Sequence, residues 1–176
     1  MRSVKVWDGF VRLFHWGTAL LFFANFTLLE GEDKLHAYAG YAVFALVLLR
    51  LLWGLIGSRH ARFSAFWPRP AAIRAHLKSL RGGEAETHLS HNPLGALMVF
   101  NLLAVLLLIG VTGLMLESDT FWGVAWVEEA HEILADYALV CVGLHVAGVI
   151  FETRRSKVNL IMAMLTGRKE IPEQGP

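Results

Sequence analysis

Two histidines in one apolar stretch are the residues whose chemistry is most informative. His131 and His145 are fourteen residues apart, close to four whole turns of an α-helix, so both imidazoles would leave the same helix face. The rise between them would be about 21 Å, most of the thickness of a bilayer core. Because imidazole is a common metal ligand, this spacing predicts one metal-binding position towards each side of a membrane.

Two further histidines complete the pattern by depth. His15 lies near the start of an earlier apolar run and His36 opens the next one, so His15 pairs in depth with His145, and His36 with His131. A low-spin b-type haem takes one imidazole on each face of its iron, and facing helices of a bundle can supply both. The four histidines therefore predict two b haems, an inner one held by His15 and His145 and an outer one held by His36 and His131.

Other interpretations of these histidines are weaker. A zinc site would gather its ligands at one point, often with thiolates, and the single Cys141 lies in an apolar run, which indicates a buried side chain. A packing or interfacial role stays the alternative for each histidine. It is more plausible for His36 and His131, because a hydrogen-bonded histidine costs little near the membrane interface.

Three arginines are candidate contacts of the haem propionates. Arg50 follows His36 by fourteen residues and so returns to the depth of the inner haem. A charge at that depth needs a counter-charge, and Arg12 and Arg154 are predicted at the same level. The alternative for Arg50 is that its side chain extends to the cytoplasmic headgroups.

The composition indicates that membrane-spanning helices position these residues. The chain has 176 residues, 55% of them hydrophobic and 18% charged, with a mean hydropathy of +0.48, which is typical of a membrane protein. The apolar runs predict an all-α membrane protein, a four-transmembrane-helix bundle with helices at about residues 13–29, 36–56, 93–116 and 131–151, forming a single di-haem domain over residues 1–176. A signal peptide is the alternative for the first run, but no small-residue cleavage site follows it.

One polar segment interrupts the apolar runs. An amphipathic connector at about residues 60–81 interleaves aromatic and basic residues and is predicted to lie on the cytoplasmic membrane surface. The histidines in and beside it are predicted to be solvated or interfacial; they are His60, His76, His88 and His91. Asn92 and Pro93 predict the start of the third span, and His91 and Asn92 are weak candidates for a quinone or propionate contact.

The charges predict the orientation. Both chain ends and the connector are basic, whereas the two short loops hold only Lys34 against seven acids, Glu30, Glu32, Asp33, Glu117, Asp119, Glu128 and Glu129. The positive-inside rule then places both termini in the cytoplasm. In a bacterium this predicts a multi-pass protein of the inner membrane, with an acidic periplasmic face.

Five stretches carry a resemblance to a known family. They read VWDGFVRLFHW (6–16), LHAYAGYAVFALVLLRLLWGLIGSRHARF (35–63), HNPLGALMV (91–99), EEAHEILA (128–135) and LHVAGVIFETRRSKVNLIMAMLTGRK (144–169). Together they resemble the bacterial cytochrome b561 family, which includes the b-type cytochrome subunit of nickel–iron hydrogenases. The resemblance implies a four-helix membrane bundle with two b haems, and ligands that match His15, His36, His131 and His145.

The expected function is transmembrane electron transfer between a periplasmic redox partner and the membrane quinone pool. The partner would be a cytochrome c or a hydrogenase-type subunit, and the chain would be the electron-transfer subunit of an oxidoreductase whose catalytic centre lies in another protein. Some members resemble superoxide oxidases that reduce ubiquinone, but an anionic substrate needs a positive approach path, and the outer loops are acidic. A haem-free scaffold or transporter is a third alternative. A homo-oligomer remains open, and no nucleic-acid partner is expected.

Overall fold

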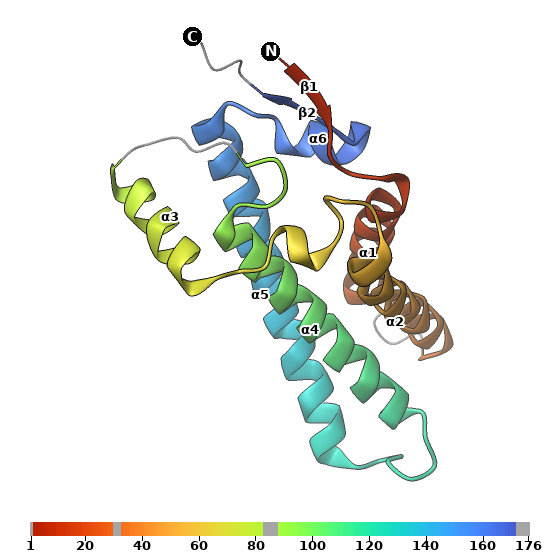
Figure 1. The fold of residues 1–176 in the computed structure, drawn as a ribbon. Coiled ribbons are helices and arrows are strands. Elements are labelled where there is room, and N and C mark those ends of the chain that lie inside the picture. The colour runs from red at the N-terminus through yellow and green to blue at the C-terminus, as the bar shows by residue number, and fades with distance from the viewer. Residues whose placement is uncertain (1, 30–32, 83–87, 172–176) are drawn as a thin grey trace. The chain divides into compact units, whose positions relative to one another are not determined.

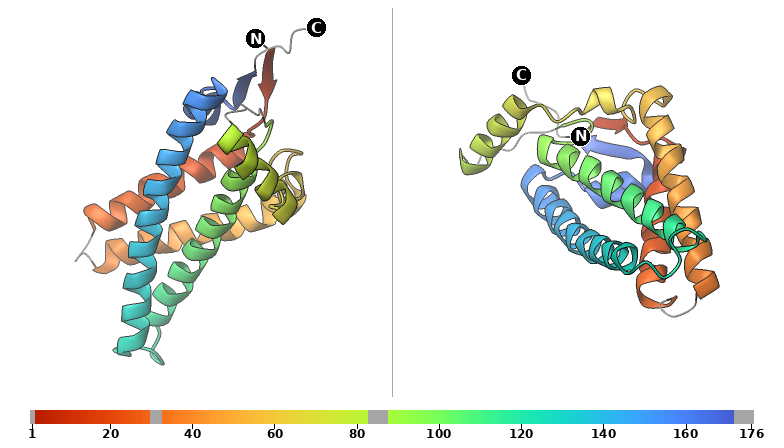
Figure 2. Two further views of the ribbon diagram at one scale, coloured as in Figure 1. Left: turned by 90° about the vertical axis from the view of Figure 1, so that its left-hand side faces the viewer. Right: turned by 90° about the horizontal axis from the view of Figure 1, so that it is seen from below.

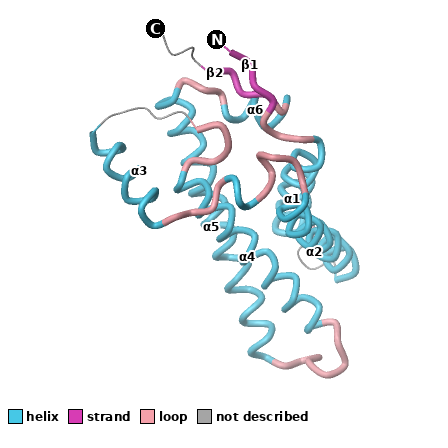
Figure 3. The backbone as a smooth tube through the Cα atoms, viewed as in Figure 1, coloured by secondary structure: helices cyan, strands magenta, loops and turns pink. Residues whose placement is uncertain are grey.

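Helices dominate the computed structural model, which describes residues 2–29, 33–82 and 88–171. The elements in chain order are β1 (Arg2–Lys5), α1 (Gly9–Thr27), α2 (Asp33–Ile56), the short 3-10 helix η1 (Phe63–Ala65), α3 (Pro70–Gly82), α4 (Pro93–Leu116), α5 (Ala125–Ser156), α6 (Leu160–Thr166) and β2 (Arg168–Ile171) (Figure 1). The helical prediction is confirmed. The all-α prediction did not include the two short strands, which Figure 3 shows in magenta.

Three of the four predicted spans coincide with helices long and apolar enough to cross a membrane, namely α2, α4 and α5. The predicted bounds 93–116 are those of α4, whereas α5 extends beyond 131–151 at both ends and α2 begins before residue 36. The predicted span 13–29 corresponds to α1, which begins at Gly9 and ends at Thr27. Helix α1, which contains Arg12, His15 and Asn25, is not among the described helices that meet the length and hydropathy of a membrane span, so the first predicted span stays a prediction. Glu30 and Glu32 lie outside the described residues.

Polar side chains fix where three helices begin. Asp8 Oδ1 accepts a hydrogen bond of 2.8 Å from the backbone N–H of Val11 at the start of α1. Asn92 Oδ1 accepts one of 2.7 Å from Gly95 N–H, with Pro93 at the first helical position, so the predicted start of the third span is confirmed. Asn159 caps α6 in the same way. Each cap satisfies an N–H that has no partner within the helix.

The chain divides into two compact units. Unit 1 comprises residues 1–12, 52–99 and 143–176, and unit 2 comprises residues 13–51 and 100–142. In unit 1, β1 and β2 form an antiparallel ladder in which Arg2 is opposite Ile171 and Lys5 is opposite Arg168. Figure 1 shows this pair of strands, which joins the two ends of the described chain, beside α6. A buried cluster of Val6, Trp7, Val11 and Ala61 packs in the same unit.

The predicted connector at 60–81 contains η1 and α3. The histidines of the connector were predicted to be solvated or interfacial. His76 is not solvated, because its exposed fraction is 2%. His76 shares its helix face with the buried Ser79, which accepts a hydrogen bond of 3.5 Å from Arg155 at the end of α5. The His76 ring also contacts that of His88, with 5.7 Å between ring centroids. The inner face of the amphipathic α3 is therefore packed against protein within unit 1.

Unit 2 consists of segments of the four long helices. Both views of Figure 2 show α4 and α5 running side by side up to the loop that joins them. Gly110 of α4 approaches Phe44 of α2 so closely that a Cβ atom would lie 2.0 Å from Phe44 Cδ2. Small residues commonly permit such approaches between membrane helices. Large apolar side chains such as Leu108 and Val140 are exposed on these helices, as expected where a helix surface faces lipid.

Candidate functional site

The two histidines predicted to form the outer pair lie close together in unit 2. The ring centroids of His36 on α2 and His131 on α5 are 6.2 Å apart, with an angle of 64° between the ring planes. Imidazole nitrogens bind metal ions at about 2 Å, and a ring nitrogen lies roughly 1 Å from its ring centre, so two rings on opposite sides of one iron have centres about 6 Å apart. The separation of the two rings therefore fits a bis-imidazole site. In the described part of the chain, no three or more His, Cys, Asp or Glu side chains form a group that could hold a metal ion.

Two adjacent residues of α4 lie beside His131. Thr112 Oγ1 lies 2.9 Å from His131 Nδ1, and a Cβ atom at Gly113 would lie 3.3 Å from His131 Cε1. The Thr112 side chain is buried, with 8% of the residue exposed. The sequence analysis missed Thr112. A threonine in an apolar helix does not indicate a functional role unless it is known which face of the helix meets α5.

The position of His36 is supported from α1. Asn25 Nδ2 donates a hydrogen bond of 3.3 Å to the backbone oxygen of His36, which links the end of α1 to the start of α2. Asn25 is one of the polar residues that interrupt the first apolar run. Its position next to the outer histidine gives that interruption a structural reason.

The predicted inner histidines lie in different units. His15 lies on α1 in unit 2, half-buried, with its ring 4.9 Å from that of Trp16 in an edge-to-face contact. His145 lies on α5 in unit 1 and is also half-buried. Their pairing around an inner haem stays a prediction that rests on sequence depth.

The three predicted propionate contacts differ in environment. Arg50 is buried, with an exposed fraction of 3%, which disfavours a side chain extended to the headgroups. Arg12 donates from Nη2 to the backbone oxygen of Leu165 at the end of α6, and Arg154 is exposed. Of the three, Arg50 is the most deeply buried.

Asp8 joins α1 to the end of α2 within unit 1. Its Oδ2 accepts hydrogen bonds from Trp53 Nε1 at 2.9 Å and Ser58 Oγ at 2.5 Å. Burial by itself would raise the pKa of Asp8, but the hydrogen bonds from Ser58, Trp53 and the backbone N–H groups of Val11 and Phe10 together hold that pKa below its ordinary value.

Lys169 of β2 is a buried cation that the sequence analysis missed. Its Nζ donates to the backbone oxygens of His88 and Ser90, at 3.0 and 2.7 Å, and lies 5.7 Å from the centre of the Trp7 ring. Burial lowers the pKa of Lys169 to about 8, although the charge of Glu152 acts in the opposite direction. These contacts attach the segment before α4 to the sheet.

The weak candidates for a quinone or propionate contact have local structural roles. The His91 ring contacts the rings of Trp7 and Phe66, with centroids 4.8 and 4.6 Å away, and Asn92 caps α4.

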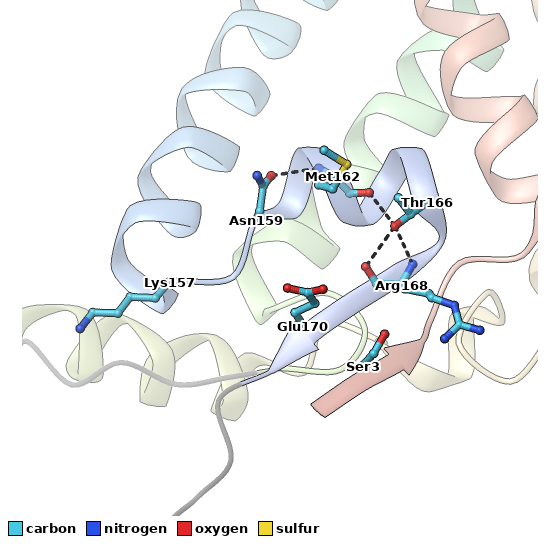
Figure 4. A pocket seen from close by; sticks show the side chains of 7 residues that line it. All are labelled: Ser3, Lys157, Asn159, Met162, Thr166, Arg168 and Glu170. Carbon is cyan, nitrogen blue, oxygen red and sulfur yellow. Dashed lines mark hydrogen bonds between the residues drawn. The ribbon is translucent and has the colours of Figure 1, made fainter. Parts of the chain in front are cut away.

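A cavity of about 230 Å³ lies beside α6 in unit 1 (Figure 4), and it is a poor candidate for a binding site. Its polar lining includes Asn159 and Thr166, which already make hydrogen bonds within α6 and to Arg168. Figure 4 shows the Lys157 and Arg168 side chains pointing away from each other, with the Glu170 carboxylate between them. The two cations therefore do not converge on a common anion.

A polar cluster connects α4 and α5 between the predicted haem depths. Asn101 Nδ2 donates to Cys141 Sγ at 3.2 Å, and Tyr137 donates its hydroxyl hydrogen to Asn101 Oδ1 at 3.1 Å. The prediction that Cys141 is buried is confirmed.

Comparison with known proteins gives one match. The family described as prokaryotic cytochrome b561 matches residues 6–167, which includes all four predicted haem ligands. No curated protein and no solved structure shows a significant match to the chain.

Proposed function

The chain belongs to the prokaryotic cytochrome b561 family, and on this basis we propose that it conducts electrons across the bacterial inner membrane through two b haems. The family transfers electrons across membranes through b-type haem, so the chain is a membrane electron-transfer protein. We further propose how many times the chain crosses the membrane, which residues bind the haems and which partners exchange electrons with it. Each of these proposals rests on a different structural feature.

The strand pairing supports four membrane crossings. β1 and β2 lie at opposite ends of the described chain and are hydrogen-bonded to each other, so both ends must be on one side of the membrane. An odd number of crossings would put them on opposite sides. Since α2, α4 and α5 have the length and hydropathy of spans, α1 is the remaining helix that can restore an even number. The basic termini then favour the cytoplasm for this side.

The approach of His36 to His131 is the observation that carries the proposal. A bis-imidazole site needs two rings whose centres are about 6 Å apart, and these two rings meet that condition at 6.2 Å from different helices. His36 and His131 are proposed to hold the outer haem. His15 and His145 are proposed to hold the inner haem, supported by their matching sequence depth.

The protein's part in the reaction is to hold the redox groups and to set their potentials. A bound b haem supplies reversible one-electron chemistry at its iron. The histidines fix its position, and the apolar helix surfaces keep water away. The buried Arg50 favours the reduced, less positive state of a group at the inner depth, whereas the outer carboxylates stabilise the oxidised state. This charge pattern favours electron flow towards the cytoplasmic side, where we propose that membrane quinone is reduced.

The loop between α4 and α5 supports a cationic redox protein as the outer partner. Glu117 and Asp119 of this loop and Glu128 and Glu129 of the first turn of α5 are all exposed. Trp122 and Trp126 beside them are exposed by 76% and 57%. Complementary charge would steer a positively charged cytochrome c or hydrogenase-type subunit to this face. The same charges would repel superoxide, the substrate of the alternative function.

The test is the haem-to-protein ratio of purified protein, measured by extracting the haem. We expect a ratio near two for the wild type and near one for each of His36→Ala, His131→Ala, His15→Ala and His145→Ala. His60→Ala, which changes a histidine outside the predicted spans, is the matched control and should retain both haems. Retention of both haems by the His36→Ala, His131→Ala double variant would refute the proposed outer site.

A further inference from the structure

One hydrogen bond beside the proposed outer site has a consequence for how His131 binds. Thr112 Oγ1 on α4 lies 2.9 Å from Nδ1 of His131 on α5. The hydroxyl is buried within a helix pair of unit 2, where water is excluded and polar atoms must find partners in the protein. Which of the two groups donates decides which imidazole nitrogen carries the proton.

The surroundings of Thr112 indicate the direction of this bond. Its Oγ1 lies 3.0 Å from the backbone oxygens of both Leu108 and Ile109, one turn earlier in α4. These oxygens can only accept, and a threonine hydroxyl has a single hydrogen to donate. Donation to the preceding turn is the usual arrangement for threonine inside a helix. With its hydrogen donated to that turn, Oγ1 acts as the acceptor and His131 Nδ1 as the donor.

A protonated Nδ1 leaves the lone pair of the neutral ring on Nε2. A metal-bound imidazole commonly needs this arrangement, in which the second nitrogen donates to a fixed acceptor that sets both the tautomer and the ring plane. Gly113 adds a steric limit, since even a methyl group there would stand 3.3 Å from His131 Cε1. The α4 backbone therefore borders the ring on the side of the hydrogen bond.

We propose that Thr112 is the positioning residue of the outer haem ligand, holding His131 in the Nδ1-protonated tautomer and fixing its ring plane. This inference rests on the proposed function, because it takes His131 as an iron ligand. Loss of the acceptor should weaken iron binding and make the imidazole a poorer electron donor. A poorer donor stabilises ferric iron less, so the potential of that haem should rise.

The experiment compares four variants of the haem-loaded protein. Thr112→Val removes the hydroxyl while keeping the shape, and Thr112→Ala removes it without a β-branch. Thr112→Ser restores a hydroxyl. Thr27→Val is the matched control, because Thr27 also donates to the preceding turn, to Phe23 O at 2.7 Å, but lies at the end of α1. The measurements are the rate of haem transfer to apomyoglobin, the two midpoint potentials, and the low-temperature electron paramagnetic resonance of the ferric haems.

The expected result is selective. In Thr112→Val and Thr112→Ala, one of the two haems should leave about 10–100-fold faster, which is the usual effect of losing such a partner. The potential of that haem should rise, and its ferric g-values should shift. Thr112→Ser and Thr27→Val should match the wild type. If one hydroxyl-free variant does not accumulate, the other and Thr112→Ser still decide the outcome.

A variant of the ligand itself separates the two ways in which the inference could fail. If His131→Ala loses one haem but the hydroxyl-free variants keep the wild-type potentials and haem release rates, Thr112 has no positioning role and the ligand assignment stands. If His131→Ala keeps both haems, the ligand assignment itself is wrong and this inference falls with it. If Thr112→Ser behaves like Thr112→Val, side-chain packing rather than the hydrogen bond explains the effect, and the inference is refuted.

Discussion

Replacement of Gly110 by alanine tests whether the close approach of α2 and α4 supports the outer site. A Cβ at this position would lie 2.0 Å from Phe44 Cδ2 and 2.7 Å from Phe44 Cγ. Cγ is at the base of the ring, so a small rotation cannot relieve the overlap, and Phe44 or the helix must move. Phe44 is on the same helix as His36, and Gly110 is two residues before Thr112.

The magnitude follows from two opposing effects. Glycine to alanine within a helix gains up to about 1 kcal/mol in helix propensity. Overpacking of a filled site costs about 1–3 kcal/mol. Gly40→Ala has the same propensity gain, but its nearest atom would be Asn25 Nδ2 at 3.8 Å, an ordinary contact. The difference in stability between the two variants therefore isolates the overlap at about 1–3 kcal/mol.

Two assays report the result. Thermal unfolding in detergent should rank Gly40→Ala above Gly110→Ala. If the strain separates His36 from His131, the same energy weakens outer-haem binding by roughly 5–150-fold, and the haem-to-protein ratio of Gly110→Ala should fall towards one during purification. Equal stability and a full haem content in both variants would refute the inferred close packing of α2 on α4.

Three further predictions concern the polar contacts. Asp8→Asn should destabilise the protein by about 1 kcal/mol in thermal unfolding at neutral pH. Because folding lowers the pKa of Asp8, the wild-type advantage should be complete above about pH 4 and disappear as the pH falls through the folded pKa; an advantage independent of pH would contradict this. For Lys169, folding lowers the pKa from 10.5 to about 8. The stability of the wild type relative to Lys169→Met should therefore rise by up to about 3 kcal/mol between about pH 8 and 10.5. Parallel pH profiles of the two proteins would show that the amine is not buried. Asn101→Leu should cost about 0.5–2 kcal/mol in thermal unfolding, because Tyr137 and Cys141 lose their partner, without changing the haem content.

The sequence predicted the elements best where local chemistry determines them. Asn92 and Pro93 mark the start of α4, and the predicted bounds of that helix agree with the structure. The span 131–151 was too short because its ends were placed where charged residues begin. Helix α5 continues through Glu128 and Arg155, because charged side chains do not interrupt the backbone hydrogen bonds of a helix.

Features that depend on tertiary contact were not predictable. The contact of Thr112 with His131 depends on how α4 and α5 are rotated about their axes, which a uniformly apolar helix does not reveal. His76 was predicted to be solvated or interfacial because it lies in a polar segment, and its burial follows from packing of one face of α3. The strands are two four-residue polar segments, and only their pairing distinguishes them from loops.

The pairing of β1 with β2 also constrains the order of events during biosynthesis. β1 is translated before its partner Arg168–Ile171, which leaves the ribosome only after α5 and α6 have been made. Residues 2–5 therefore cannot form this ladder until Arg168–Ile171 has been made, after the intervening helices. Closure of the ladder is then a late step, because it joins segments separated by nearly the whole chain. A truncation that removes β2 should leave β1 without its partner in the ladder.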